Sequence, residues 1–432
     1  MSTNSAIKPI HLLVLVHGMW GDPSNLAELA RVVRETRGLD SDDVELHVLL
    51  AETNRAESTY DGVDWGGERV AREIADEIEK LGLEGKKVTR FSVTGYSLGG
   101  LISRYLVGIL HQREFFKDVT PVNFNTVATP HIGLPRYPSF FSSVISSLGP
   151  KLLSRTGEQF YCVDKWSANG RPLLEVMADP DRIFFQALLL FQEIRIYANA
   201  INDMTVPYVT SAIEIYDPFA AHLTNGIQIE INKEYGPIID TYTLPSTPVP
   251  TPPKPIILSP RWFRSFNRPL LPPAFQMRFP LNLVLYALLP ILIPAFISLA
   301  LVRFKLATRS SQARIRLLES DEANSDKLVH IFAQLERSVE DTVADYIDEP
   351  GPISSASNSE AAGATSPDHP ILTPLQRRIA ANLNKLPLKK ELAFFPNVRN
   401  AHAVIVCRDI KRFELHKMGE GVVKHWANSF IM

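Results

Sequence analysis

Residues 88–107 have the sequence VTRFSVTGYSLGGLISRYLV, and this stretch decides the fold. Its first seven residues are rich in β-branched and aromatic side chains, as in a buried strand, and its last seven have the composition of a helix. Ser97 therefore lies on a predicted turn between a strand and a helix. Gly95 and Gly99 flank it, and so sharp a turn requires glycine because a Cβ would collide with the neighbouring backbone. The pattern predicts a nucleophilic serine.

A second motif lies near the N-terminus. Residues 12–16 are all apolar and predict a short buried strand, which is followed by HGMWG at residues 17–21. In α/β-hydrolases the loop after an early strand supplies one backbone N–H of the oxyanion hole, and the residue after the nucleophile supplies the other. This rule assigns the two donors to Met19 and Leu98. For His17 we expect support of the loop rather than titration in the reaction.

Composition excludes several classes of protein. The 45 basic and 47 acidic residues leave a formal charge of −2, which argues against nucleic-acid binding. The two cysteines, Cys162 and Cys407, provide neither metal-ligand spacing nor a disulfide framework, so we expect no metal, no cofactor and a reducing, cytosol-facing environment. Residues 1–8 have no basic start before a long apolar run, and no cleaved secretory signal is expected.

The order of predicted elements indicates the fold class. Residues 69–81 place apolar side chains at helical spacing and end at Gly82, while 123–128 and 193–198 read as strands. Alternation of strands and helices favours an α/β protein with the α/β-hydrolase fold, in which the sheet is mostly parallel and doubly wound. A membrane-inserting hydrophobic segment is expected to interrupt this fold.

Six segments follow from composition. Six prolines crowd residues 245–255, which blocks helix and sheet, and Thr373-Pro374 has the form of a helix start. The predicted segments are a hydrolase core at 8–245, a Pro-rich linker at 246–278, a hydrophobic membrane hairpin at 279–302, a helical region at 303–349, a flexible Ser/Ala/Gly-rich loop at 350–372, and a C-terminal part at 373–432 that completes the hydrolase.

A catalytic serine needs a histidine base, and the histidine needs a carboxylate, in the chain order Ser, acid, His. For the acid we favour Asp203, which follows a late strand on a turn-forming Asn-Asp pair; Asp217 and Asp164 are the rivals. For the base we favour His402, which lies in a loop-like stretch just before the apolar run 403–407. Chain order narrows the choice of histidine without settling it, and His222 and His131 stay open as alternatives.

Five motifs in this order resemble those of the eukaryotic putative serine esterase family, an α/β-hydrolase family of lipases, and are closest to its fungal lipid-droplet phospholipases. The resemblance covers about 8–220 and returns at about 390–430. It implies that Ser97, Asp203 and His402 form the triad and that His131 is a structural support. The implied activity is hydrolysis of acyl esters of glycerophospholipids. The motifs are VHGMWG at 16–21, GYSLGG at 95–100, TPHIG at 129–133, NDMTVP at 202–207 and NAH at 400–402.

The run 279–302 carries no charged residue and is long enough to enter a bilayer core. A single crossing would separate Ser97 from His402, so we expect the run to enter and leave on one face, bent at Pro290 and Pro294. Basic residues flank both ends, which agrees with a hairpin. A buried helix of a soluble protein and an ordinary transmembrane span are the alternatives.

These features together predict a serine acyl hydrolase attached to a membrane or a lipid droplet, most simply a phospholipase. A neutral-lipid lipase, an acyltransferase, or a membrane tether with an inactive hydrolase domain are the alternatives. The expected partners are an acyl-lipid substrate and a lipid surface, either a lipid droplet or the cytosolic face of the endoplasmic reticulum. Residues 137–153 are interpreted as either a lid over the acyl site or a plain core helix.

Overall fold

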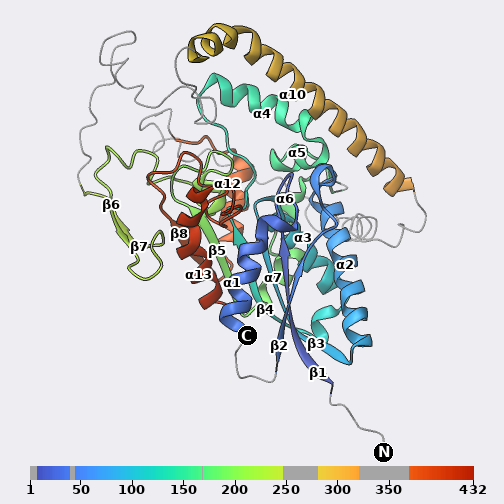
Figure 1. The fold of residues 1–432 in the computed structure, drawn as a ribbon. Helices are drawn as coiled ribbons and strands as arrows, with labels where there is room; N and C mark the ends of the chain where they lie inside the picture. The colour runs from blue at the N-terminus through green and yellow to red at the C-terminus, as the bar shows by residue number, and fades with distance from the viewer. Residues whose placement is uncertain (1–6, 39–43, 168, 247–280, 321–368) are drawn as a thin grey trace, which may run out of the picture.

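A six-stranded sheet forms the centre of the computed structural model, which describes residues 7–38, 44–167, 169–246, 281–320 and 369–432 (Figure 1). The strand order is β2-β1-β3-β4-β5-β8, and every neighbouring pair is parallel. This order confirms the α/β-hydrolase fold class. The strands are β1 Lys8–Val16, β2 Glu45–Leu50, β3 Lys86–Tyr96, β4 Thr120–Val127, β5 Glu193–Asn199 and β8 Leu388–Ala393, and β6 Gln228–Ile231 pairs antiparallel with β7 Ile239–Thr243 apart from the sheet.

Helices cover both faces of the sheet. Alternate side chains of β1 point to opposite faces, so Leu12 and Val14 join one hydrophobic cluster whereas Leu13 and Leu15 join the other. The first cluster includes side chains of α2 Val63–Leu83, α3 Leu98–Gln112 and α7 Ile183–Leu189, and the second includes those of α1 Ala27–Arg37 and α13 Glu420–Asn428. Both faces of the sheet are therefore buried, which explains the continuous apolar run in β1.

The remaining elements are short and lie mostly in the connections. The helix predicted to start at Thr373-Pro374 is confirmed: Thr373 and Gln376 form a capping box at its N-terminus. These elements are the helices α4 Phe140–Leu152, α5 Ser154–Phe160, α6 Leu173–Val176, α8 Tyr208–Ser211 and α12 Pro374–Leu383, and the 3₁₀ turns η1 Pro23–Leu26, η2 Ala56–Tyr60, η3 Phe115–Lys117 and η6 Glu414–Gly419.

The chain returns to the sheet after a long excursion. Strand β8 pairs with β5 along its whole length, from Ile194 opposite Leu388 to Asn199 opposite Ala393. Residues after β8 then pack on the sheet, and Val404, Ile405 and Val406 are almost completely buried. The C-terminal segment thus supplies both an edge strand and part of the core.

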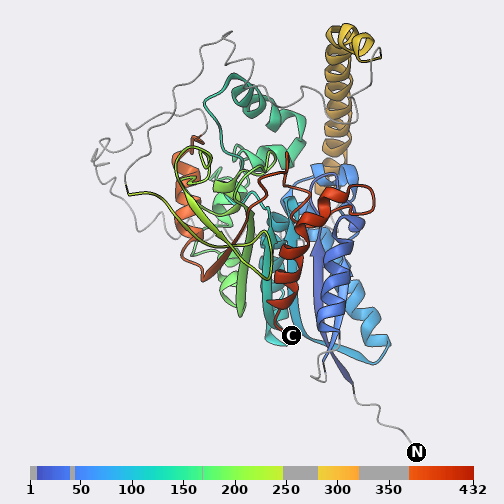
Figure 2. The ribbon, with the colours of Figure 1, turned by 60° about the vertical axis from the view of Figure 1, so that its left-hand side comes forward.

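Helix α10, Leu281–Ser320, differs from the predicted hairpin. It is one continuous helix through Pro290 and Pro294, so the two separate arms of the predicted hairpin are wrong, although the first turns of the helix tilt away from the rest of its axis (Figure 2). Each proline removes one backbone hydrogen bond, and the bonds around it hold the helix together. Figure 2 shows α10 extending beyond the rest of the molecule. Among the described residues it is the one helix long and apolar enough to cross a membrane, and its most apolar window is unburied.

The second half of α10 docks on the hydrolase. It contacts α4, α5 and η2, and Ser311 is completely buried. Ser311 hydrogen-bonds Ser154 (Oγ–Oγ 3.1 Å), the Thr308 hydroxyl donates to the Leu152 carbonyl (2.7 Å), and Arg314 pairs with the buried Asp61 (2.9 Å). These polar contacts fix the direction in which the exposed apolar half of the helix points.

Several predicted segments lie outside the described residues. These are the linker at 247–278 and the part of the helical and Ser/Ala/Gly-rich regions between 321 and 368. Residues 140–152 form α4, and the core-helix interpretation of this stretch is wrong because Phe140 and Ile145 are 78% and 60% exposed. Helix α4 lies on the surface next to α10 (Figure 1).

Candidate active site

Ser97 lies on a strained turn between β3 and α3. Its φ of +55° and ψ of −124° are conformations that residues other than glycine rarely adopt. Close packing explains the two flanking glycines: a Cβ on Gly95 would lie 2.4 Å from the Gly99 carbonyl oxygen, and one on Gly99 would lie 2.0 Å from the carbonyl oxygen of Val16. The turn directs the Ser97 side chain away from the strand, at the carboxyl edge of the sheet.

His402 brings its imidazole to this serine. Its Nε2 lies 3.1 Å from Ser97 Oγ, and its Nδ1 lies 2.9 Å from Asp203 Oδ2. Tyr96, the neighbour of the serine, donates a hydrogen bond from its hydroxyl to the His402 carbonyl oxygen (2.9 Å). The centroid of its ring lies 5.1 Å from that of the imidazole. The imidazole therefore lies between the hydroxyl and the carboxylate, with the orientation that a general base requires.

Asp203 accepts four hydrogen bonds. The backbone amides of Thr205 (2.9 Å) and Val206 (2.8 Å) donate to Oδ1, while the Asn199 side-chain amide (2.8 Å) and His402 reach Oδ2. Its side chain is only 1% exposed. So many donors hold the carboxylate in one orientation and stabilise its negative charge, which in turn favours the proton of the imidazole on Nδ1.

The loops that carry His402 and Asp203 are joined directly. The amide of Ala401 donates to the Asn202 carbonyl (2.8 Å), and the Asn202 side chain donates to the Phe395 carbonyl (2.9 Å). Asn400 Oδ1 accepts from the amides of both Met204 (3.4 Å) and His402 (3.2 Å). These bonds link the ends of the neighbouring strands β5 and β8, so the distance between acid and base is set by the sheet.

The loop at residues 17–21 packs against the nucleophile. A Cβ on Gly18 would lie 2.8 Å from the Ser97 Cβ, so the loop approaches closely because residue 18 lacks a side chain. Met19 follows on this loop, and Leu98 is the first residue of α3. Both residues named for the oxyanion hole therefore flank the serine, and their role as N–H donors stays a prediction.

The two further predicted residues, His17 and His131, are buried histidines. Burial lowers the pKa of His17, whose Nδ1 lies 3.0 Å from the Gly18 carbonyl oxygen. Burial lowers the pKa of His131 well below its usual range, and the nearby charge of Arg104 acts in the same direction. His131 Nε2 hydrogen-bonds Thr126 Oγ1 (2.8 Å), and Arg104 donates to its carbonyl oxygen (2.9 Å). Both contacts hold loops next to the site.

The rival residues bind elsewhere. Asp164 accepts from the Leu173 amide (2.8 Å), and burial raises its pKa to about 6. Asp217 accepts from the Phe219 amide (2.9 Å), and burial raises its pKa likewise to about 6. His222 contacts the Phe219 carbonyl oxygen. None of the contacts described for these residues involves Ser97 or His402.

In the part of the chain that the structure describes, no group of three or more His, Cys, Asp or Glu side chains lies close enough to hold an ion. The arrangement of Ser97, His402 and Asp203 suits a different chemistry. A hydroxyl next to a base that a carboxylate orients is the arrangement for nucleophilic attack on an acyl carbonyl.

Sequence reasoning missed three supporting residues. Tyr96 and Asn199 contact His402 and Asp203, and the buried Arg104 holds the carbonyl of His131. Tyr96 had a signal, since it lies inside the GYSLGG motif. Asn199 ends β5 four residues before Asp203, at the sheet edge where the acid was expected. An arginine in the apolar face of a predicted helix was the signal for Arg104.

The fold and this arrangement define the class of protein, an α/β-hydrolase with a serine nucleophile elbow. Residues 6–213 match the model of the family described as "Putative serine esterase (DUF676)". This stretch is a little under half of the chain, and the match confirms the resemblance stated from the motifs.

Curated relatives agree with this match. The chain is 34% identical over 214 residues to "Putative lipase C4A8.10" of Schizosaccharomyces pombe, covering 48% of this chain and 26% of that protein. It is 26% identical over 242 residues to "Putative lipase ROG1" of Saccharomyces cerevisiae, covering 55% of this chain and 33% of that protein. The chain thus spans about a third or less of the length of these curated relatives. The solved lin2722 gene product of Listeria innocua is 16% identical, and the alignment covers 46% of this chain and 76% of that one with a TM-score of 0.27. The fold assignment therefore rests on the strand order.

Proposed function

We propose that the protein is a serine acyl hydrolase that acts on the lipids of a membrane or a lipid droplet, and that its reaction is cleavage of acyl esters of glycerophospholipids. The observation that carries this proposal is the contact of His402 with both Ser97 (3.1 Å) and Asp203 (2.9 Å). The match of residues 6–213 to the serine esterase family model supports the same chemistry.

In the proposed reaction His402 Nε2 takes the proton of Ser97 as its oxygen attacks the ester carbonyl. The imidazolium is stabilised by Asp203 through Nδ1, and the amides of Met19 and Leu98 stabilise the oxyanion. His402 then returns the proton to the departing lysophospholipid alkoxide, which leaves an acyl-Ser97 ester. Water, deprotonated by His402, hydrolyses this ester and releases the fatty acid.

Two apolar surfaces support action at a lipid interface. In the first half of α10 large side chains are exposed, among them Ile291 and Phe296 at 68% and 73%. Helix α4 adds Phe140, Val144, Ile145 and Leu148 on the neighbouring surface. Exposed apolar area of this extent is rare on soluble monomers and marks an interaction surface. A helix segment from 284 to 302 is about 28 Å long, close to the thickness of a bilayer core.

The path of the chain limits how α10 meets the lipid. The chain leaves the hydrolase after β7 and returns at α12, on the same molecule, so any crossings of a membrane must be even in number. Arg303 and Lys305 follow the apolar half, just before the docked part of the helix. We therefore place α10 in a single leaflet, which also suits the monolayer of a lipid droplet or the cytosolic leaflet of the endoplasmic reticulum.

A contact between α10 and the loop of the proposed oxyanion hole connects the apolar helix with the proposed active site. Phe304 of α10 stacks on Trp20, with ring centroids 6.2 Å apart, and the Trp20 indole N–H donates to the Tyr60 hydroxyl (2.9 Å). Trp20 follows Met19 directly and has a φ of +54°. The lipid-facing helix thus touches the residue next to a proposed oxyanion donor, which favours catalysis close to the lipid surface.

The test is hydrolysis of phospholipid and triacylglycerol emulsions by the purified full chain and by Ser97→Ala and His402→Ala. We expect both variants to lose activity on phospholipid by 10³-fold or more. Ser103→Ala and His416→Ala are the matched controls. Ser103 donates to the Gly99 carbonyl and His416 accepts from the Asp409 amide, so neither of these hydrogen bonds involves the proposed triad.

Each other outcome has a defined meaning. Activity that survives His402→Ala but not Ser97→Ala contradicts the assigned base. Preference for triacylglycerol indicates a neutral-lipid lipase, and transfer of the acyl group to an added alcohol indicates an acyltransferase. Failure of Ser97 to react with a fluorophosphonate probe in the folded protein indicates a tether without turnover.

A further inference from the structure

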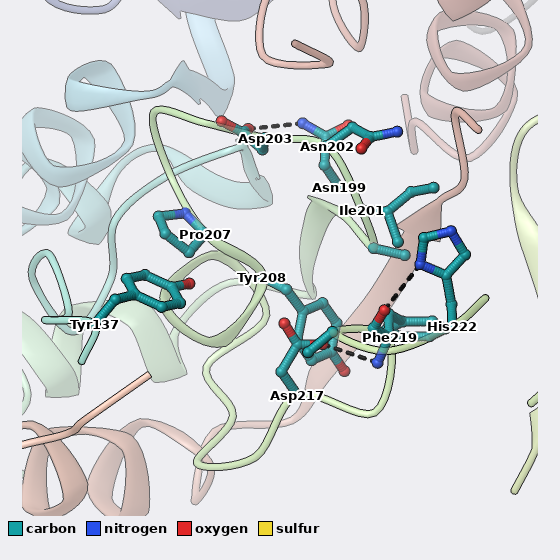
Figure 3. A pocket seen from close by; sticks show the side chains of 12 residues that line it. Tyr137, Asn199, Ile201, Asn202, Asp203, Pro207, Tyr208, Asp217, Phe219 and His222 are labelled. Atoms are coloured by element: carbon teal, nitrogen blue, oxygen red, sulfur yellow. Dashed lines mark hydrogen bonds between the residues drawn. The ribbon is translucent and has the colours of Figure 1, made fainter. Parts of the chain in front are cut away.

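Next to the proposed acid the surface is hollowed into a pocket of about 180 Å³. Figure 3 shows Asp203 and Asn199 at one end and Asp217 at the other, with Tyr137 and Tyr208 between them. The side chains come from three separate stretches of chain: the loop before α4, the end of β5 with the Asp203 loop and α8, and residues 217–222. Tertiary packing therefore builds the pocket, which lies at the same sheet edge as Ser97.

The pocket carries negative charge. Two carboxylates, Asp203 and Asp217, line it, and the lining contains no lysine or arginine. Asp217 is 9% exposed and is held by the Phe219 amide, and within the described residues no lysine or arginine forms an ion pair with it. Burial raises the pKa of Tyr137, and the charges of Asp217 and Asp203 act in the same direction, so this side chain lies within range of the two carboxylates. A cation would compensate a charge that burial otherwise makes unfavourable.

Aromatic rings form much of the remaining wall. Tyr208 and Phe219 pack edge to face with ring centroids 5.2 Å apart, and Tyr137 joins them from the opposite loop. Rings of this kind attract a cation to their faces, and clusters of them with a carboxylate are a recurring way to bind quaternary ammonium groups. Aromatic walls also favour an organic cation over a metal ion, which would need a shell of oxygen ligands.

A third observation is an unused acceptor. Asn199 is 1% exposed and lines the pocket; its Nδ2 donates to Asp203, whereas its Oδ1 has no hydrogen-bond partner. A buried acceptor without a donor is unfavourable, because it loses its hydrogen bonds to water without replacement. A ligand N–H, a polarised methyl group next to a cationic nitrogen, or a water between them would satisfy it.

Size limits the ligand further. Pockets for whole drug-sized molecules measure about 300–1,000 Å³, so 180 Å³ holds a head-group fragment and excludes an acyl chain. Between Asp203 and Ser97 Oγ lie one imidazole and two hydrogen bonds. The pocket therefore borders the proposed triad at Asp203.

We infer that this pocket is a subsite for an alkylammonium head group, the choline or ethanolamine of a phospholipid, bound by Asp217 and the rings of Tyr137, Tyr208 and Phe219. This inference rests on the proposed function and names the substrate class within it. Asp217 is a binding residue here, and it has no part in the chemical steps at Ser97.

The first experiment measures binding without turnover. Tetramethylammonium and phosphocholine are titrated into the full chain carrying Ser97→Ala and followed by calorimetry, with sodium chloride and glycerol 3-phosphate at equal concentration as controls. We expect saturable binding of both quaternary ammonium compounds and at least tenfold weaker binding after Asp217→Asn. Asp164→Asn is the matched control, since Asp164 is another buried carboxyl group that bonds a backbone amide outside the pocket.

Binding that is absent, or that Asp217→Asn leaves unchanged, overturns the subsite. Because Ser97→Ala removes the nucleophile, this result does not depend on whether the protein hydrolyses phospholipid. The conservative variant Tyr208→Phe keeps the ring and is expected to retain most of the binding, whereas Tyr208→Leu is expected to lose it. Equal loss in both contradicts the assigned role of the ring.

The second experiment separates a lipid head group from a free cation. Vesicles of phosphatidylcholine or of phosphatidylglycerol are given to the protein with Ser97 intact, with and without Asp217→Asn. We expect the ratio of kcat/KM for choline lipid over glycerol lipid to fall at least tenfold in the variant. An unchanged ratio, together with positive binding of tetramethylammonium, overturns the head-group assignment and indicates a site for a free alkylammonium ligand.

Discussion

The exchange Asp203→Asn probes the proposed triad most sharply, because it keeps the size of the side chain and alters only the position of protons. The carboxylate accepts two backbone amides on Oδ1 and two side-chain donors on Oδ2. The backbone amides of Thr205 and Val206 cannot turn. The carbonyl oxygen of an asparagine will therefore stay with them, and its amide nitrogen will take the place of Oδ2.

That nitrogen donates a hydrogen bond where the carboxylate accepted one. His402 Nδ1 must then become the acceptor, and the imidazole proton moves to Nε2, which faces Ser97 Oγ at 3.1 Å. A base that already carries the proton cannot take another from the serine. The same tautomer reversal in a Ser–His–Asp triad lowers kcat about 10⁴-fold, equivalent to about 5 kcal/mol of transition-state stabilisation.

Folding should change much less than catalysis. The Asn199 amide faces the altered position, and a half-turn of that amide presents its unpartnered Oδ1 to the new donor. We expect the midpoint of thermal unfolding to stay within a few degrees of the unmodified protein, because the new pairing replaces the lost one. The site keeps its hydrogen bonds, and the base loses its function.

The assay is steady-state hydrolysis of a soluble p-nitrophenyl ester, combined with thermal unfolding followed by circular dichroism. Asp164→Asn is the control, because Asp164 is also a buried acceptor of a backbone amide and lies in a different part of the fold. We expect the control to retain its rate within a few-fold. A folded Asp203→Asn protein whose kcat stays within tenfold of the unmodified enzyme refutes the reasoning and returns the acid to another carboxylate.

Three further exchanges have defined outcomes. Gly99→Ala puts a Cβ 2.0 Å from a carbonyl oxygen of β1 and is expected to cost about 3 kcal/mol in urea unfolding, whereas Gly82→Ala, where the space is open, should stabilise by about 0.5–1 kcal/mol. Burial raises the pKa of Asp217 to about 6, so the ionised group destabilises the fold above that pH. Asp217→Asn should therefore add up to about 3 kcal/mol of unfolding free energy at pH 8 and almost none at pH 3.5. An equal gain at both pH values contradicts this expectation. Tyr96→Phe leaves the buried His402 carbonyl without its donor and should cost about 1–3 kcal/mol of unfolding free energy; no measurable loss means that water replaces the hydroxyl.

Local pattern was sufficient for the elements that form from neighbouring residues. The stretch 88–107 reads as strand, serine and helix, and the structure has β3 and α3 on the two sides of Ser97. The apolar stripe at 69–81 lies within α2, and the capped start at Thr373 begins α12. Periodicity and capping act over a few residues, so they can be read without knowledge of the fold.

Composition did not determine the shape of the hydrophobic segment. A bent hairpin and a straight helix need the same apolar residues and tolerate the same prolines, so the run 279–302 was equally compatible with both. The contacts of Ser311, Thr308 and Arg314 with distant parts of the hydrolase accompany the continuous helix. The same holds for α4, whose apolar residues fit a core helix in sequence and lie exposed beside α10.

The sequence by itself determined the fold class, the resemblance to a serine esterase family and the position of the serine elbow, because a sharp strand-to-helix turn depends on adjacent glycines and on the strand and helix beside it. Only the tertiary structure decided which groups meet at that turn. His402 and Ser97 are separated by 305 positions and His402 and Asp203 by 199, and they come together because β8 pairs with β5 at one edge of a parallel sheet. The hollow between Asp203 and Asp217 likewise exists only in the folded chain, since strand order and loop packing, which no local pattern encodes, assemble its walls.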